Sequence, residues 1–197
     1  MKSIAIFCGS STGADPIFAE AARAMGRAIA ERELRLVYGA GSVGLMGIVA
    51  NEVLAHGGKV LGVIPQFLVD LEVGHTGLTE LIVTETMHER KLAMAEAADG
   101  FIAMPGGIGT LEELIEVLTW TQLGVHQKQC GLFNVGGYWD HLIRMIDHMV
   151  DQRFLKSSQA KLLHTGTFDK LSGAADAGAL LGTVLAEGPA WEGKWLG

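Results

Sequence analysis

The sequence has little of what a disulfide-stapled, metal-held or membrane-spanning protein contains. Its 197 residues include two cysteines, Cys8 and Cys130, too few for a disulfide framework or a four-cysteine zinc site and typical of a reducing compartment. No apolar stretch reaches the roughly 18 residues of a membrane span. The apolar run after Met1-Lys2-Ser3 is too short for a secretory signal. We therefore expect a cytoplasmic protein that does not associate with membranes.

An excess of positive charge is also missing. Fifteen Lys and Arg residues stand against 22 Asp and Glu residues, which makes the formal net charge −7. This balance argues against a general binder of nucleic acid or of anionic membranes. Any phosphate that the protein binds must be held by local geometry against the net charge.

Apolar residues make up 49% of the chain and charged residues 19%, which excludes a disordered chain. The length is that of one domain, which we expect over residues 1–186, followed by a tail over residues 187–197. Glycine is abundant, with 27 glycines against 4 prolines. Most of the clustered glycines follow short apolar runs, where they allow positive φ and a close approach of backbone amides to a ligand.

Short apolar runs alternate with amphipathic stretches along the chain. The apolar runs predict strands over Ser3–Cys8, Leu34–Tyr38, Lys59–Ile64, Leu81–Thr84, Gly100–Met104, Gln129–Asn134 and Lys161–His164. The amphipathic stretches predict helices over Pro16–Glu31, Gly44–His56, His88–Ala98, Thr110–Leu123, Trp139–Asp151 and Leu171–Ala186. Strands that are apolar nearly throughout are typical of a parallel sheet covered on both faces. The pattern predicts an α/β fold: a single doubly wound, Rossmann-like parallel sheet of about seven strands with helices on both faces.

Ligands of such sheets bind beyond the carboxyl ends of the strands, near the point where strand order reverses. Three of the first five turns at that edge are rich in glycine and lead toward a helix, namely Gly9-Ser10, Gly39–Gly44 and Pro105–Thr110. Main-chain amides at a helix N-terminus bind anions. These turns therefore predict a phosphate site.

The segment Gly39-x-Gly41-x-x-Gly44 matches the glycine pattern of dinucleotide-binding folds. A dinucleotide site also needs an acidic residue about 20 residues further on, but the next predicted strand runs into Pro65-Gln66 without a carboxylate. We favour two other interpretations over an NAD-dependent enzyme. The loop binds a mononucleotide or other phosphate, or its glycines only let the helix pack closely on the strand.

The segment Pro105–Glu113 carries the strongest signal, because three glycines precede Thr110 at the start of a predicted helix. Exposed amides and the helix dipole, worth roughly 0.3–1 kcal/mol toward an anion, favour a phosphate there. Thr110 would offer its hydroxyl to a phosphate oxygen. The alternative is a capping box formed by Thr110 and Glu113. That alternative explains both side chains but not the three glycines, so we favour the anion site.

The segment Met87–Lys91 places two cations, Arg90 and Lys91, near the start of a predicted helix. The helix dipole disfavours cations there by a few tenths of a kcal/mol, roughly, and a bound anion would offset this. The alternative is a solvated charged turn in which Glu89 pairs with the cations. The segment lies beside the Pro105–Thr110 loop if the fourth and fifth strands are neighbours.

Three segments together carry a family resemblance: Tyr38–Gly47, the Met-His-Glu-Arg-Lys run at 87–91, and the Pro-Gly-Gly-Ile-Gly-Thr-Leu-Glu-Glu run at 105–113. With them the chain resembles the LONELY GUY family of cytokinin riboside 5′-monophosphate phosphoribohydrolases, often mislabelled lysine decarboxylases, over residues 2–185. Ala40 departs from the glycine that the family often has there. A decarboxylase would need a pyridoxal phosphate lysine with its surrounding motif, and the sequence contains none.

The resemblance implies hydrolysis of the N-glycosidic bond of a purine nucleoside 5′-monophosphate to the free base and ribose 5-phosphate. Such cleavage builds oxocarbenium-like charge on the sugar, which a carboxylate stabilises. We expect Glu113 to supply the carboxylate, Arg90 to hold or polarise the substrate, and Gly106–Thr110 to bind the 5′-phosphate. Glu112 lies about 100° around the helix from Glu113, so only one of them faces the sugar.

The expected substrate contacts extend beyond the catalytic pair of Arg90 and Glu113, and the family's pattern adds Glu72, Lys91 and Thr119. In full they are Gly9, Ser10, Gly41, Glu72, Met87, Arg90, Lys91, Gly106, Gly107, Ile108, Gly109, Thr110, Leu111, Glu112, Glu113 and Thr119. We expect no metal and no cofactor, because neither a cation clamp nor a carboxylate cluster is evident. The family is typically dimeric, and we expect a homodimer in which Leu114, Ile115, Leu118 and Trp120 supply a second buried face.

Two other functions stay open. An AMP nucleosidase without a cytokinin role would use the same residues, because the sequence does not identify those that read the N6 substituent. Related Rossmann-like proteins with similar glycine loops carry nucleotide-containing cofactors, such as the molybdenum cofactor, without hydrolysing them. Glu113 together with Arg90 favours the enzyme, because a carrier does not need a carboxylate pressed toward an anionic ligand.

Overall fold

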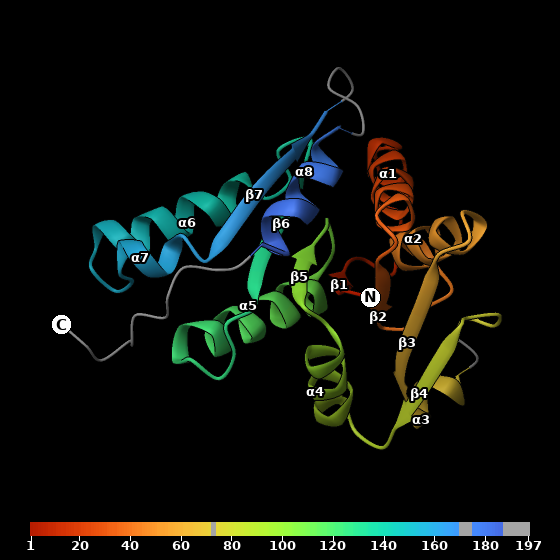
Figure 1. Ribbon diagram of the computed structural model, residues 1–197. Helices are drawn as coiled ribbons and strands as arrows, with labels where there is room; N and C mark the ends of the chain where they lie inside the picture. Colours follow the sequence, from red (N-terminus) through yellow and green to blue (C-terminus); the bar gives the residue numbers. More distant parts are fainter. Residues whose placement is uncertain (72–73, 170–174, 187–197) are drawn as a thin grey trace.

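Seven parallel strands form a single sheet in the computed structural model, which describes residues 1–71, 74–169 and 175–186 (Figure 1). The strands are β1 (Ser3–Phe7), β2 (Arg35–Tyr38), β3 (Lys59–Pro65), β4 (Glu80–Thr84), β5 (Gly100–Ala103), β6 (Gln129–Val135) and β7 (Leu163–Phe168). Their order across the sheet is β4-β3-β2-β1-β5-β6-β7. The chain therefore reverses direction across the sheet between β1 and β5, the point at which ligands bind in such folds.

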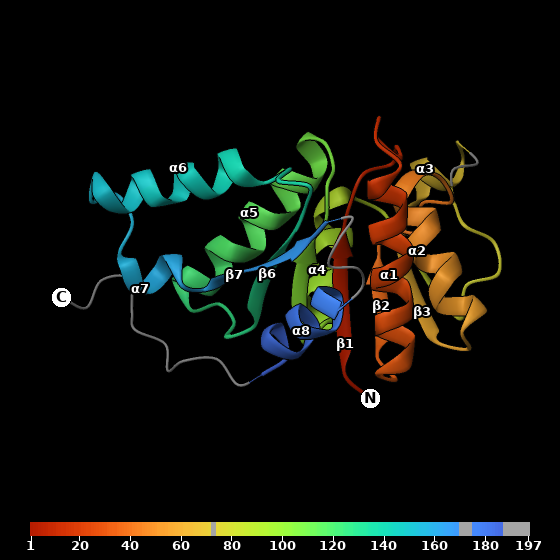
Figure 2. The same cartoon turned by 90° about the horizontal axis from the view of Figure 1, so that it is seen from above.

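Helices cover both faces of this sheet (Figures 1 and 2). They are α1 (Ile17–Glu31), α2 (Gly44–Ala55), α3 (Gln66–Val69), α4 (Met87–Ala97), α5 (Ile108–Leu123), α6 (Asp140–Asp151), α7 (Ser157–Ala160) and α8 (Ala175–Val184). α1, α2 and α8 pack on one face around Met25, Ile29 and Leu180. α4, α5 and α6 pack on the other around Met94 and Leu114. The predicted fold class is confirmed.

The inner strands explain the apolar runs of the sequence, since every residue of β1, β5 and β6 is buried. A strand covered on both faces has no polar side to alternate with its apolar one. The edge strand β4 differs, because Leu81, Ile82 and Val83 are all exposed. None of the helices within the described ranges is long and apolar enough to cross a membrane.

Several local predictions are wrong. The last strand covers Leu163–Phe168 rather than 161–164, because polar threonines and a glycine interrupt its apolar pattern. The short helices α3 and α7 have no counterpart in the prediction. β4 and β5 are not neighbours, since β3, β2 and β1 lie between them. Residues 171–174 of the last predicted helix and the predicted tail, 187–197, lie outside the described residues.

Candidate active site

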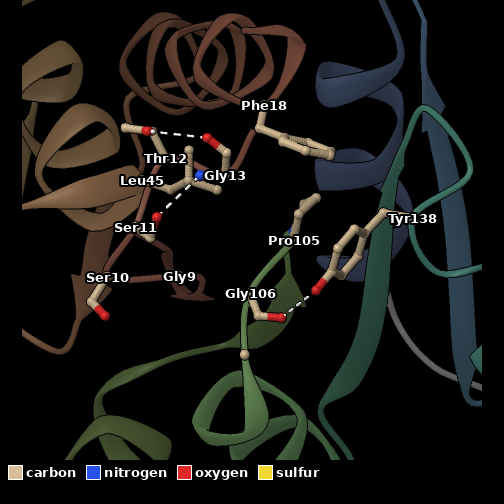
Figure 3. A pocket seen from close by; sticks show the side chains of 11 residues that line it. Gly9, Ser10, Ser11, Thr12, Gly13, Phe18, Leu45, Pro105, Gly106 and Tyr138 are labelled. Carbon is tan, nitrogen blue, oxygen red and sulfur yellow. Dashed lines mark hydrogen bonds between the residues drawn. The ribbon is translucent and has the colours of Figure 1, made fainter. Parts of the chain in front are cut away.

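Two glycine-containing loops meet where strand order reverses. The Gly9 amide, directly after β1, donates to the Pro105 carbonyl after β5 at 3.1 Å. Between these loops lies a cavity of about 310 Å³ (Figure 3). It is lined by Gly9, Ser10, Ser11, Thr12, Gly13, Phe18, Leu45, Pro105, Gly106, Gly107 and Tyr138. The structure thus brings two of the predicted loops together, and four predicted contact residues line the same cavity: Gly9, Ser10, Gly106 and Gly107.

Three helix N-termini at this edge are already occupied by groups of the chain itself. In α1, the Asp15 carboxylate accepts from the Ile17 amide at 2.9 Å. In α2, the carbonyl of Gly9 accepts from the Leu45 amide at 3.0 Å. In α4, Thr86 and Glu89 form a capping box. An anion would have to displace a carboxylate, a carbonyl or a capping pair at any of them.

The N-terminus of α5 is different. Its N-cap residue is Gly107, which has no side chain to cap the helix, and the first amide bonded within it is that of Leu111, which donates to Gly107 at 3.1 Å. Within the described ranges, no group accepts a hydrogen bond from the amides of residues 108–110. A glycine loop that leads into three free donors and a helix dipole is a suitable anion-binding site. We call the amides of residues 108–110 and the loop before them the phosphate seat.

Thr110 lies in the first turn of α5 and not at its N-cap, because the helix begins two residues earlier than predicted. The capping box considered for Thr110 and Glu113 is therefore absent, and the box at this edge belongs to α4. Thr110 is buried, and a Cβ on Gly106 would lie 2.2 Å from its Oγ1. The hydroxyl thus packs directly against the glycine loop, which only a glycine at 106 permits.

Arg90 and Glu113 form the charged centre of the site. Arg90 Nη2 lies 3.3 Å from Glu113 Oε1, and both side chains are largely buried. The Arg90 Nε also donates to the Val63 carbonyl, at the end of β3, at 3.2 Å. α4 carries Arg90 here because it crosses under the sheet from β4 to β5 and contacts β3, β2 and β1 on the way. The predicted proximity of the two segments therefore arises from the crossover helix and not from adjacent strands.

The electrostatics of Glu113 reflect two opposing influences. Burial raises the pKa of the Glu113 carboxyl, and the Arg90 guanidinium acts in the opposite direction. The Cys8 thiol at the end of β1 is buried close by, and its burial followed by the charge of Glu113 raises its pKa far above the usual range. Cys8 is accordingly a buried, neutral thiol near the carboxylate and not a nucleophile.

Lys91 faces α5 one residue beyond Arg90. Its Nζ donates to Glu112 at 2.6 Å and to Glu116 at 3.0 Å. Partial burial lowers the pKa of Lys91, but hydrogen bonds to these two carboxylates outweigh it and raise the pKa overall. Glu112 and Glu113 thus pair with different cations on different sides of α5, as the helical geometry predicts.

The remaining predicted contacts are scattered. Met87 opens α4, and its sulfur lies 3.9 Å from Arg90 Nη1. Thr119 donates to the Ile115 carbonyl at 2.6 Å and lines a separate groove of about 160 Å³ between α5, α6 and α7. Glu72 lies outside the described residues. The substrate contacts expected at Lys91 and Thr119 stay predictions.

The glycines of the Gly39–Gly44 loop make room for neighbouring groups. A Cβ at Gly44 would lie 2.2 Å from the backbone of Ser10, and one at Gly41 would lie 2.5 Å from the Met46 side chain. With the N-terminus of α2 occupied by a carbonyl, these contacts favour the packing interpretation of the motif. A substrate contact at Gly41 stays a prediction.

Two cavity residues were not predicted from the sequence, Phe18 and Tyr138, whose rings meet edge to face 5.8 Å apart. Tyr138 follows Gly136 and Gly137, both of positive φ, directly after β6. This is a further glycine-rich turn at the carboxyl edge of the sheet. Since ligands of such sheets bind beyond the carboxyl ends of the strands, the turn after the sixth strand could have been predicted in the same way as those after the first five. Phe18 has no such signal, because an aromatic residue at the start of a helix is ordinarily a core residue.

Comparison with known proteins places these features in a family context. A family model described as "Possible lysine decarboxylase" matches residues 46–171. The cytokinin riboside 5′-monophosphate phosphoribohydrolase of Rhodococcoides fascians is 50% identical over 155 residues, which are 78% of each chain. Two proteins of the same name from Arabidopsis thaliana, LOG5 and LOG7, are 49% and 50% identical, over 80% and 82% of this chain and 69% and 75% of their own.

Solved structures share the fold at much lower identity. The molybdenum cofactor carrier protein of Chlamydomonas reinhardtii superposes with a TM-score of 0.69 at 20% identity, covering 93% of this chain and 97% of the carrier. The molybdenum cofactor binding protein of Rippkaea orientalis gives 0.66 at 20% identity, with 94% and 98% coverage. Likeness at this identity establishes a common architecture and says nothing of the ligand.

Proposed function

Because the chain belongs to the LONELY GUY family, we propose that it is an N-glycosyl hydrolase that cleaves cytokinin riboside 5′-monophosphates. The reaction consumes water and releases the free base and ribose 5-phosphate. The observation that carries the proposal is the position of Glu113, which is largely buried and lies 3.3 Å from Arg90 of α4, on the same helix, α5, whose first three amides have no acceptor among the described residues. One helix thus offers a phosphate seat and a carboxylate, about one turn apart.

The phosphate end of the substrate is held by the loop before α5. The amides of residues 108–110 and the dipole of a 16-residue helix favour a dianion. Thr110 adds a hydroxyl beside the loop. Since the protein's net charge is −7, these local donors, and not a general positive field, provide the attraction.

The sugar end faces Glu113. As the bond between C1′ and the base nitrogen breaks, the electron pair leaves with the base and positive charge grows on the ring. A carboxylate in a partly buried site stabilises this charge more than one in water does. Water then forms the new bond to C1′ and loses a proton, while the base nitrogen gains one.

Arg90 has two roles in this scheme. Its ion pair opposes the rise in the pKa of Glu113 that burial causes, and so favours the charged carboxylate. Its remaining N–H groups hold the substrate beside that carboxylate. Anchors on β3 and α5 fix the guanidinium before substrate arrives, which lowers the cost of ordering it on binding.

The test is incubation of the purified protein with AMP and with N6-isopentenyladenosine monophosphate, followed by chromatography for the free bases and an assay for ribose 5-phosphate. We expect release of both products, faster from the N6-substituted nucleotide. Equal or faster cleavage of AMP would identify an AMP nucleosidase instead. Tight binding of either nucleotide without any release of base would identify a carrier and contradict the proposal.

We propose further that the protein acts as a homodimer in the cytoplasm. Apolar side chains on α4 and α5 support association, since Leu92 is 50% and Ile108 83% exposed. Of the four residues expected at a second buried face, Ile115 is exposed but Leu114 is fully buried in the chain's own core. Light scattering at micromolar concentration would reveal a monomer if the proposal is wrong. The free thiols of Cys8 and Cys130 support a reducing location, which cell fractionation would test.

A further inference from the structure

Tyr138 connects the turn after β6 with the glycine loop before α5. Its hydroxyl donates to the Gly106 carbonyl at 2.5 Å, across 32 residues of sequence. Figure 3 shows the ring reaching over the cavity to Gly106, with Ser10 on the opposite side of that glycine. We propose that Tyr138 is a positioning residue for the phosphate seat, which it orients through the backbone of this loop. The inference rests on the proposed function.

The hydrogen bond from Tyr138 acts on the peptide between Gly106 and Gly107. Peptide bonds in the described residues are all trans, and in a planar trans peptide the C=O and the following N–H point in opposite directions. Fixing the Gly106 carbonyl toward Tyr138 therefore fixes the Gly107 N–H away from it. That amide then adds a donor to the free amides at the start of α5.

On its Gly107 side this peptide is loosely packed. Nothing lies within 4 Å of the position that a Cβ on Gly107 would take, and a pair of glycines rotates with a low barrier. Without the Tyr138 hydroxyl, the Gly106 carbonyl is free to turn toward the seat, where its partial negative charge would repel a phosphate. The hydrogen bond therefore decides which face of the peptide the ligand meets.

Tyr138 is itself held in place before any ligand arrives. Its ring meets Phe18 edge to face at 5.8 Å and Trp139 at 4.9 Å. The turn is closed by Asn134, whose side chain accepts from the Trp139 amide at 2.8 Å and donates to Asp140 at 2.8 Å. Because its ring and its turn are both held in place, Tyr138 can keep its hydroxyl, and with it the Gly106 carbonyl, in one orientation.

The experiment compares wild-type protein with Tyr138→Phe, which removes the hydroxyl and keeps the ring. Calorimetry with ribose 5-phosphate measures the seat without turnover. We expect about tenfold weaker binding, the upper range for one hydrogen bond. The KM for the nucleoside 5′-monophosphate should rise by a similar factor with kcat changed less than about threefold, and cleavage of the phosphate-free riboside should be unaffected. Tyr38→Phe is the matched control, because it also deletes a tyrosine hydroxyl, but one that has no hydrogen-bond partner among the described residues and does not line this cavity. It should bind ribose 5-phosphate as wild type does.

The outcomes separate this inference from the proposed function. Unchanged ribose 5-phosphate binding by Tyr138→Phe overturns the inference even if the wild type is an active hydrolase. Equal losses in kcat for the monophosphate and the riboside also overturn it, because they indicate a general structural role. If the wild type cleaves no nucleotide but binds ribose 5-phosphate, and Tyr138→Phe loses that binding, the function fails and the inference stands.

Discussion

The guanidinium of Arg90 occupies the space that a side chain on Gly39 would need. A Cβ at Gly39 would lie 1.9 Å from Arg90 Nη2, so glycine at the end of β2 is a condition for the Arg90–Glu113 pair. The ion pair to α5, the hydrogen bond to β3 and the close packing after β2 together hold this one side chain in place.

Gly39→Ala should therefore displace Arg90 and lower kcat/KM by about 100-fold, the cost of a misplacement of about 1 Å in a catalytic group. Overpacking should also destabilise the fold by about 1–3 kcal/mol. Gly182→Ala on α8 is the control, because nothing lies within 4 Å of its Cβ position. It should keep full activity and be as stable as wild type or slightly more so. Steady-state kinetics and urea denaturation measure both effects; a fully active Gly39→Ala would refute the account.

Glu113→Gln should lower kcat by about 10²–10⁴-fold, because the amide keeps the shape but not the charge that stabilises the sugar cation. The free energy of unfolding should fall by about 3 kcal/mol, because the buried Arg90 loses its counter-charge, but no helix cap depends on this side chain and the protein should still fold. Glu112→Gln removes a carboxylate at the adjacent position, which pairs with Lys91 instead, and should retain most of the activity. A reversed order of the two variants would show that the wrong carboxylate has been assigned.

The pH dependence of kcat/KM follows from the environment of Glu113. Its pKa is raised by burial, so activity that needs the carboxylate should fall on acidification at a pH above the ordinary range of a glutamate. Glu112 and Glu116 each raise this pKa further. Glu112→Gln should therefore move the acidic limb to lower pH, and Glu113→Gln should abolish it. Because the substrate phosphate titrates identically with every variant, a limb common to all of them would belong to the substrate.

Stability toward acid should depend on His126. Burial lowers the pKa of His126 to about 4, with Lys128 adding to the effect. The folded state then binds fewer protons than the unfolded state, whose histidine titrates near 6.5, so stability should be lost as the pH falls from about 6.5 to about 4. His126→Gln should reduce this loss, as measured by denaturation midpoints at pH 7.5 and 5. The exposed His148→Gln should leave the pH dependence as it is in wild type.

The sequence predicted the architecture because its signals are local. Continuous apolar runs reveal strands buried on both faces, and amphipathic spacing reveals the helices between them. The same logic failed for β7, where threonines and a glycine occur on an edge strand. It also misplaced the start of α5, because Thr110 carries a capping signal that the tertiary structure leaves unused.

The succession of strands and helices along the chain and the glycine loop at Pro105–Thr110 could be predicted from the sequence, because turn residues and periodicity act over a few positions. The choice of Arg90 and Glu113 as site residues rests on the motifs at 87–91 and 105–113 and stays a prediction. Only the tertiary structure decided that the first amides of α5 have no acceptor among the described residues, whereas the Leu45 amide at the start of α2 donates to the carbonyl of Gly9, in the loop after β1. It also decided that Arg90 of the crossover helix α4 reaches Glu113, and that the Tyr138 hydroxyl donates to the Gly106 carbonyl from 32 residues away. Which amides already have acceptors, and which charged side chains pair, depends on residues that are far apart in the sequence. A local sequence pattern therefore cannot predict these contacts.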